Sequence, residues 1–239
     1  MPAYEITHEL IERYRKIDTP TIWSALHTLY GYGLSFMQGV DLQTPGRKLV
    51  GRARTVRFVP SRPDLLAETG KGQNAPETHA MNRCGPGDVL VCDVNGVRYG
   101  SSGGDMKLLQ LKMNRAEGIV TDGAIRDLST VRKYGYIIYA KGGTPSAALA
   151  PWPMSFEENV VIGCGGIAVR PGDLIVGDDD GVMCVPQQWA VAVADWSEEH
   201  NEFEEIIKER VIRENVPPMT YYNSAMFDKL KKEKEARKK

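Results

Sequence analysis

Arginine and aspartate side chains gather in one glycine-rich stretch, residues 103–127, which reads GGDMKLLQLKMNRAEGIVTDGAIRD. Arg126 can hold a carboxylate through two parallel hydrogen bonds, and Asp105 and Asp127 offer the oxygen ligands that a hard divalent cation prefers. Because Arg126 and Asp127 are sequence neighbours, we expect their side chains to point in opposite directions and to find separate partners. These residue types predict a site where a small anion and a divalent cation meet.

A predicted helix over residues 106–117 follows the double glycine Gly103-Gly104. Glycine lets a ligand approach backbone N–H groups that a Cβ atom would shield. The first N–H groups of a helix attract anions, and here they belong to Met106 and Lys107. The stretch matches neither a dinucleotide-binding fingerprint nor a P-loop, so nucleotide binding is not expected.

An arginine, backbone donors and a magnesium-like ion together suit a 2-oxo acid. The cation would chelate the keto oxygen and one carboxylate oxygen, while Arg126 binds the carboxylate. Such a cation acts as a Lewis acid worth several kcal/mol when the carbon–carbon bond beside the carbonyl breaks. Aldol cleavage and oxaloacetate decarboxylation would both lead to pyruvate. The alternative is structural: Asp105 serves only as a helix cap, and Asp122-Gly123 only as a turn.

The composition is that of an ordinary soluble globular protein. The chain has 239 residues, of which 42% are hydrophobic and 26% charged, and its net charge is −1. Nucleic-acid binding is not expected, because it rests on a basic surface. No apolar run is long enough to predict a membrane span or a secretion signal, so we expect a cytoplasmic protein. The four cysteines have no zinc-like spacing and are expected to be buried free thiols: Cys84, Cys92, Cys164 and Cys184.

Helices are predicted at both ends of the chain and strands in its middle, an α/β arrangement with one dominant core. The expected helices cover residues 6–16, 21–30, 106–117 and 189–215. The expected strands cover residues 49–59, 86–91, 119–121, 136–140, 160–163, 166–169, 171–176 and 182–186. Two near copies, PGDVLV and PGDLIV, predict two related edges of one sheet. The strand–helix–strand order from Val89 to Val120 predicts a parallel strand pair.

The segment of residues 60–86 is long and rich in glycine, proline and polar residues. Such a loop inside a compact domain often forms a lid or a binding loop. It holds Lys71, Glu77 and His79, with a short helix expected over residues 77–83. His79 could act there as an acid or base, although a lone loop histidine is more often merely exposed.

Three runs in a fixed order resemble one known family: GGDM…RAEGIVTDGAIRD, KGGTPSAA and PGDLIVGDDDGVMCVP. The chain is similar to the RraA-like family. Members of that family include the regulator of ribonuclease E activity and the 4-hydroxy-4-methyl-2-oxoglutarate/4-carboxy-4-hydroxy-2-oxoadipate aldolases. These aldolases are class II pyruvate aldolases. The similarity covers about residues 19–216 and is strongest over residues 87–186.

The resemblance implies a single RraA-like domain over residues 1–239, with a core of about 19–216. The charged composition of residues 228–239 predicts an exposed, partly frayed tail. The resemblance implies an α/β, β/β/α swivelling-domain-like fold with flanking N- and C-terminal helices. It also implies a homotrimer or homohexamer with active sites between subunits.

The resemblance further assigns roles within the glycine-rich stretch. Asp127 would be the ligand of a divalent metal, Mg²⁺ or Mn²⁺, and Arg126 would anchor the substrate carboxylate. Asp105 would hold a metal-bound water. Gly104 and the N–H groups that follow it, at Met106 and Lys107, would bind pyruvate.

A catalytic glutamate from the C-terminal helix of a neighbouring subunit is also implied. Glu202 is the nearest match, with Glu198 and Glu199 as alternatives, and a solvated helix face is the plain reading of all three. Family aldolases place an acidic residue three positions after the Arg-Asp pair, where this chain has Thr130. That departure, together with residues 60–86 and Lys107, suggests a different substrate, such as a sugar-acid-derived keto acid.

Two functions therefore remain open from the sequence. The first is a metal-dependent lyase that cleaves a 4-hydroxy-2-oxo acid to pyruvate and a carbonyl product, with oxaloacetate decarboxylation as a related activity. The second is a non-catalytic regulator that binds a ribonuclease or a helicase. The metal and arginine positions favour the enzyme.

Overall fold

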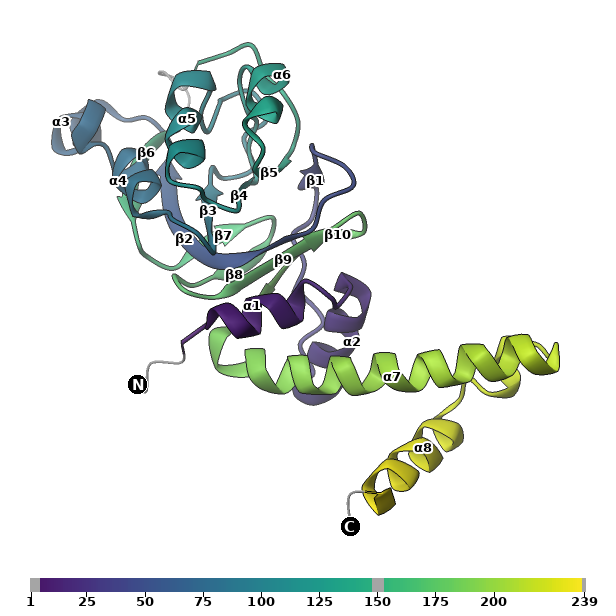
Figure 1. Ribbon diagram of the computed structural model, residues 1–239. Coiled ribbons are helices and arrows are strands. Elements are labelled where there is room, and N and C mark those ends of the chain that lie inside the picture. The colour runs from purple at the N-terminus through teal and green to yellow at the C-terminus, as the bar shows by residue number, and fades with distance from the viewer. Residues whose placement is uncertain (1–4, 148–152, 238–239) are drawn as a thin grey trace.

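A mixed sheet built around one long strand forms the centre of the molecule (Figure 1). The computed structural model of the chain describes residues 5–147 and 153–237. The sheet order is β1-β5-β4-β3-β2-β9-β10, and β6 also pairs with β2. The strands are β1 (Asp41–Leu42), β2 (Leu49–Val59), β3 (Asp88–Asp93), β4 (Gly118–Thr121), β5 (Ile137–Ala140), β6 (Met154–Glu158), β9 (Leu174–Asp178) and β10 (Gly181–Val185). A separate hairpin pairs β7 (Ile162–Cys164) with β8 (Ile167–Val169).

The parallel strands β2, β3, β4 and β5 lie side by side. In the register of β3 and β4, Val89 stands opposite Gly118 and Val91 opposite Val120. The helix α5 (Asp105–Met113) lies between these two strands in sequence, which confirms the predicted parallel pair. All residues of β3, β4 and β5 are buried, as the unbroken apolar runs of a doubly covered parallel sheet require.

The two Pro-Gly-Asp turns lead into neighbours of the same strand. Strand β3 pairs with β2 in parallel and β9 pairs with β2 antiparallel, which confirms the predicted relation. Gly87 and Gly172 have φ angles of 79° and 88°, a region where a side chain is strained. The repeated tripeptide thus places two strands on either side of β2.

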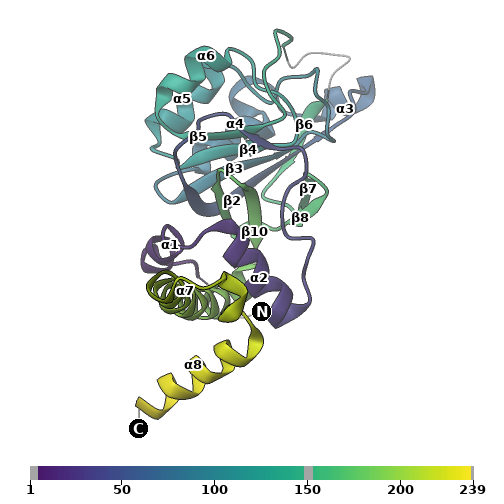
Figure 2. The same cartoon turned by 90° about the vertical axis from the view of Figure 1, so that its right-hand side faces the viewer.

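Helices cover the two sides of the sheet system (Figures 1 and 2). On one side lie α3 (Pro63–Glu68), α4 (Pro76–Arg83), α5 and α6 (Leu128–Val131). On the other lie α1 (His8–Tyr14), α2 (Thr19–Tyr30) and α7 (Ala190–Glu214). Leu108 and Leu111 of α5 pack with Ile119 and Ile138 of the sheet, and all four are fully buried. The α/β class, the two N-terminal helices and the long helix near residue 190 were all predicted from the sequence.

The C-terminal region is largely exposed, as predicted, but it is a regular helix rather than a partly frayed tail. It forms a helix, α8 (Ser224–Arg237), below the end of α7 (Figure 1). Leu230 is 4% exposed and packs against Phe203 and Ile207 of α7. The sequence analysis did not predict this helix, because its composition is mostly charged. Its few apolar residues pack against α7.

Helix α5 is also shorter than predicted, since it ends at Met113 rather than near residue 117. Arg115 adopts a φ of 57°, which turns the chain out of the helix. The short strands β1 and β6 and the helix α3 carry too little pattern to be predicted.

The four cysteines are buried and free, as predicted. Burial raises the pKa of the Cys84 thiol to about 12, and it raises the pKa values of the other three thiols well above their ordinary value. In the described ranges, no helix has the length and apolarity that crossing a membrane requires.

Candidate active site

Gly104 lets a carboxylate rest against the backbone where α5 begins. A Cβ atom at this position would lie 2.8 Å from Oδ2 of Asp127 and 3.3 Å from Cβ of Arg126. The same Oδ2 accepts a hydrogen bond from the N–H of Asp105 at 3.3 Å. A side chain at residue 104 would therefore displace the Asp127 carboxylate, which explains why residue 104 is a glycine.

Asp127 has left-handed backbone angles, φ 57° and ψ 32°. This conformation interrupts the alternation of side chains, and Nε of Arg126 lies 3.6 Å from Oδ1 of Asp127. The prediction that the two side chains point apart and cannot pair is therefore wrong. Aspartate tolerates this conformation better than most residues. It places the guanidinium and the carboxylate together, both about half exposed, at the start of α6.

A serine holds the two chain segments of the site together. The hydroxyl of Ser101 donates to the carbonyl of Gly103 at 2.6 Å. Its oxygen accepts hydrogen bonds from the N–H groups of Gly103, at 3.0 Å, and Arg126, at 3.2 Å. Ser101 also pairs in parallel with Ala124. The sequence analysis missed this residue, whose only signal is its place just before the double glycine.

The first turn of α5 presents free backbone donors beside this carboxylate. The first N–H with an acceptor inside the helix is that of Leu108, which donates to the carbonyl of Gly104 at 2.9 Å. Within the described residues, the N–H groups of Met106 and Lys107 have no acceptor. The Met106 side chain is 79% exposed, so it leaves the turn open. Free N–H groups at a helix start are the donors that an anion would use, and their role in binding one stays a prediction.

Asp105 has a partner that the sequence analysis missed. The hydroxyl of Tyr134, in the short helix η2 (Arg132–Tyr134), donates to Oδ1 of Asp105. Tyr136 lies near Tyr134, and its hydroxyl donates to the carbonyl of Leu108 at 3.2 Å. Burial, with a smaller contribution from the charge of Asp105, raises the pKa of Tyr136. The two tyrosine hydroxyls thus hold the first turns of α5, one at Asp105 and one at Leu108.

The side chain of Lys107 turns toward the segment of residues 60–86. Its Nζ lies 2.7 Å from Oε1 of Glu77 in α4, the helix predicted there. Glu77 is 9% exposed and Lys107 is about half exposed. His79, on the same helix, is exposed. The structure therefore joins two of the residues singled out in the sequence into one ion pair beside the site.

The glutamates of α7 do not reach Asp127 within one chain, because α7 lies across the sheet from α5 and α6 (Figures 1 and 2). Lys234 of α8 pairs with Glu202 at 2.6 Å and with Glu199 at 3.5 Å. Glu198 pairs with Arg13 at 2.8 Å. A role for any of the three in a neighbouring subunit stays a prediction.

The residues at the site fit a cation that keeps much of its water. Among the residues described, no group of three or more His, Cys, Asp or Glu side chains could hold a metal. Magnesium is commonly bound through one or two carboxylates, with waters and substrate oxygens completing its shell. Asp127, before α6, is half exposed, and Asp105 is the first residue of α5. These two carboxylates meet the requirement for one or two protein ligands. Thr130, half-buried in α6, adds no carboxylate.

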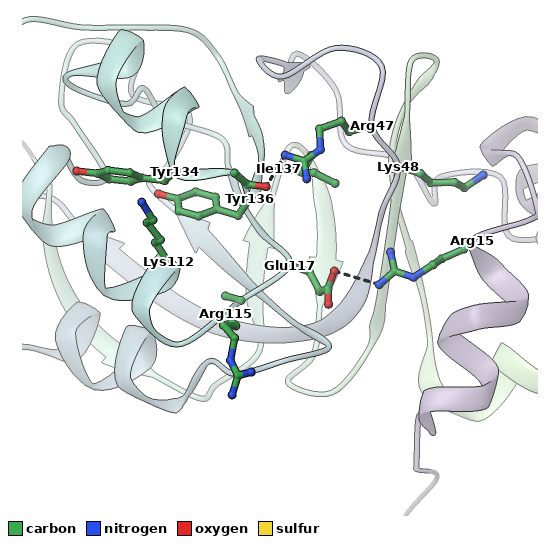
Figure 3. A pocket seen from close by; sticks show the side chains of 11 residues that line it. Arg15, Arg47, Lys48, Lys112, Arg115, Glu117, Tyr134, Tyr136 and Ile137 are labelled. Atoms are coloured by element: carbon green, nitrogen blue, oxygen red, sulfur yellow. Dashed lines mark hydrogen bonds and ion pairs between the residues drawn. The ribbon is translucent and has the colours of Figure 1, made fainter.

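A basic pocket of about 460 Å³ lies at the opposite end of α5 (Figure 3). Its only carboxylate is Glu117, which accepts a hydrogen bond from Arg15 at 3.0 Å. Lys112 stands over the Tyr134 ring, 5.3 Å from its centre. The remaining cations that line the pocket are Arg47, Lys48 and Arg115. Tyr134 thus lines this pocket while its hydroxyl holds Asp105 of the candidate site.

A family model and a relative of nearly full length identify the family of this chain. The family model RraA-like, described as Aldolase/RraA, matches residues 19–184. A protein of Halalkalibacterium halodurans named "Putative 4-hydroxy-4-methyl-2-oxoglutarate aldolase" is 32% identical over 92% of this chain and 96% of its own.

Two crystal structures have the same fold over most of both chains. One is Streptomyces coelicolor RraAS2, described as an unusual member of the RNase ES inhibitor RraA protein family. It is 32% identical, with a TM-score of 0.76 over 85% of this chain and 98% of that one. The other is an uncharacterized protein from Pseudomonas syringae, 25% identical, with a TM-score of 0.77 over 90% of this chain and 93% of that one.

Proposed function

Since this chain belongs to the RraA-like family, we propose that it is a divalent-metal-dependent carbon–carbon lyase. It cleaves a 4-hydroxy-2-oxo acid to pyruvate and a carbonyl product, and it decarboxylates oxaloacetate at the same site. One observation carries the proposal. The Asp127 carboxylate and the Arg126 guanidinium lie together against Gly104, the residue directly before the open first turn of α5.

The chain's own groups would bind the pyruvate half of the substrate. The exposed guanidinium of Arg126 supplies two parallel donors for a carboxylate. The N–H groups of Met106 and Lys107 add backbone donors at a helix start, where the helix dipole favours negative charge. These groups fix which end of the substrate lies against Asp127.

Asp127 would hold the cation, Mg²⁺ or Mn²⁺, with Asp105 nearby. Bound there, the cation supplies Lewis-acid stabilisation of the charge that develops on the 2-oxo group during cleavage, worth several kcal/mol. Asp105, oriented by the Tyr134 hydroxyl, would position a water beside the reacting carbons. The N–H of Asp105 and the missing side chain of Gly104 keep the Asp127 carboxylate in place.

We assign the remaining acid or base to a neighbouring copy in a homotrimer or homohexamer. Within one chain Glu202 of α7 pairs with Lys234 of α8. Because α7 lies across the sheet from Asp127, only a neighbouring copy would bring this glutamate to the site (Figures 1 and 2). Thr130 stands where family aldolases carry an acidic residue, which favours a substrate other than theirs.

The test is pyruvate release from 4-hydroxy-2-oxo acids and from oxaloacetate. Turnover should require Mg²⁺ or Mn²⁺, should stop with EDTA, and should be lost in Asp127→Ala. Asp228→Ala is the matched control, because Asp228 is exposed on α8, away from the site (Figure 1). Metal-independent turnover, or an Asp127→Ala variant as active as Asp228→Ala, would refute the proposal.

A second candidate function is a non-catalytic regulator that binds a ribonuclease or helicase through an acidic segment. The basic pocket at the far end of α5 favours it, since five cations and one carboxylate line the pocket. Arg15 and Lys48 pair with carboxylates. Among the described residues, that leaves Arg47, Lys112 and Arg115 without an ion-pair partner. This function predicts that wild type captures such a partner, that Arg115→Glu does not, and that no keto acid is turned over. Turnover without a partner would eliminate it.

A further inference from the structure

The basic pocket at the far end of α5 is not used by the chemistry proposed at Asp127 (Figure 3). Its volume of about 460 Å³ lies in the range of small-molecule sites, about 300–1,000 Å³. The five cations that line it come from three separate parts of the chain: the end of α1, the segment before β2 and the end of α5. The fold therefore assembles this pocket, and no single basic run of the sequence does.

The one carboxylate that lines the pocket, Glu117, already has partners. Its Oε2 accepts a hydrogen bond from Arg15 at 3.0 Å, and its Oε1 accepts one from the N–H of Gly87 at 3.2 Å. Lys48 pairs with two carboxylates that do not line the pocket. An anion that enters the pocket therefore meets a paired carboxylate, and the charges of Arg15 and Lys48 are already balanced.

Three other cations of the pocket have no acidic partner within the described residues: Arg47, Lys112 and Arg115. One donor of the Arg47 guanidinium is bonded to the carbonyl of Gly135, which fixes this side chain at the pocket. Lys112 stands over the Tyr134 ring, 5.3 Å from its centre. Charge complementarity with these three cations favours a ligand that carries about three negative charges.

The backbone of Arg115 indicates that its charge is used. Arg115 follows the end of α5 with a φ of 57°, and its N–H donates to the carbonyl of Lys112 at 3.1 Å. The N–H of Ala116 donates to the carbonyl of Leu111 at 3.0 Å, which completes the helix end. Glycine is the usual residue at such a position, because a Cβ atom is strained in the left-handed region. An arginine there carries a conformational cost that its charge would offset.

Tyr134 connects this pocket to the candidate site. Its ring lines the pocket under Lys112, while its hydroxyl donates to Oδ1 of Asp105. The N–H of Asp105 in turn donates to Oδ2 of Asp127 at 3.3 Å. A cation over the ring face polarises the phenol and strengthens its hydroxyl as a donor. An anion bound to Lys112 would offset that charge and weaken the hydrogen bond to Asp105.

We propose that the basic pocket binds a small polyanion with about three negative charges, on carboxylate or phosphate groups, and that Tyr134 transmits its binding to Asp105. A metabolite fits better than an acidic segment of a protein. A stable protein contact covers about 800 Å² on each partner, whereas the unpaired cations here line one pocket. The inference needs no turnover at Asp127, so it goes beyond the proposed function.

The first experiment measures which anions bind. Citrate, pyrophosphate and acetate are titrated into the full chain without added metal and followed by calorimetry. The tighter of citrate and pyrophosphate should exceed acetate at least about tenfold in affinity, and it identifies carboxylate or phosphate as the recognised group. Acetate binding as tightly as both would overturn the inference. A hexa-aspartate peptide that binds more tightly than either would also overturn it and would favour the regulator.

The second experiment places that binding in the pocket. Arg115→Gly removes one charge and suits the left-handed backbone, so this variant should be at least as stable as wild type. It should weaken binding of the tighter polyanion about 3- to 10-fold, the effect of one partly exposed charged hydrogen bond. Lys232→Gln is the matched control, because Lys232 is exposed on α8 and its loss lowers the net charge equally. Equal affinities of Arg115→Gly and Lys232→Gln would overturn the inference.

The third experiment tests the coupling through the backbone amide signal of Asp105, with Asp228 on α8 as the reference. The polyanion should shift the Asp105 signal in wild type and leave that of Asp228 unchanged. Tyr134→Phe keeps the ring and lacks the hydroxyl, so it should bind within about twofold of wild type without the Asp105 shift. An equal Asp105 shift in both proteins would overturn the coupling. The expected shifts in a protein that turns over no 2-oxo acid would overturn the proposed function alone.

Discussion

Replacing Gly104 with alanine tests whether the position of Asp127 matters. The added Cβ would lie 2.8 Å from Oδ2 of Asp127, whereas an ordinary contact begins near 3.4 Å. The carboxylate is 43% exposed and can swing toward solvent, so it moves by about 0.6 Å rather than the backbone. Gly104 has a φ of −131°, which any residue adopts, so alanine adds no backbone strain.

The expected result is a folded protein with an impaired site. A misplacement of about 1 Å costs about 100-fold in rate, so a shift of this size should cost about 10-fold or more in kcat/KM for pyruvate release. The melting temperature should change little, because a loss of about 1 kcal/mol shifts it only about 2–4 °C in a domain of this size.

Gly85→Ala is the matched control. A Cβ at Gly85 meets no atom within 4 Å, and its φ is not in the left-handed region. Both variants are compared by kcat/KM at saturating Mg²⁺ and by thermal unfolding. Activity of Gly104→Ala equal to that of Gly85→Ala, with both proteins folded, would refute the reasoning.

Three further predictions concern charge and burial. Arg126→Ala should weaken pyruvate binding by about 1.5–3 kcal/mol, the contribution of a charged hydrogen bond, as measured by titration calorimetry; unchanged affinity would contradict its role. Burial raises the pKa of Asp122 above its ordinary value of 3.8, so the native state holds this proton more tightly than the unfolded state. Its contribution to the free energy of unfolding should therefore be largest below pH 3.8 and should be lost as the pH rises through the raised pKa, and urea titrations of Asp122→Asn should lack that slope. The cysteine thiols should not react with iodoacetamide at pH 8 in the native protein, since burial raises the pKa of Cys84 to about 12 and raises the pKa values of the other three well above their ordinary value; mass spectrometry of native and denatured samples checks this.

The sequence predicted those elements whose pattern is long or unbroken. The buried runs of β3, β4 and β5 and the stripe of α7 are strong local signals, and each was found within a few residues of its predicted bounds. Strand β6 exists because β2 offers it an edge, which no local pattern records. Helix α8 depends on Leu230 packing against α7, a contact between distant parts of the chain.

The candidate site was predictable in its residue types but not in its geometry. The glycines, Arg126 and the two aspartates could be identified because their chemistry is visible in the sequence. The pairing of Arg126 with Asp127 could not, because it follows from the left-handed backbone of Asp127 packed against Gly104. Tyr134 was missed for a similar reason, since only the fold brings its hydroxyl to Asp105.

A crystal structure of the protein soaked with pyruvate and Mn²⁺ tests the central claim most directly, because the anomalous signal of manganese locates the cation. We expect that signal at the Asp127 carboxylate, with the pyruvate carboxylate on Arg126 and on the N–H groups of Met106 and Lys107. Manganese bound elsewhere, or pyruvate in the basic pocket of Lys112 and Arg115 with the start of α5 empty, would contradict the account.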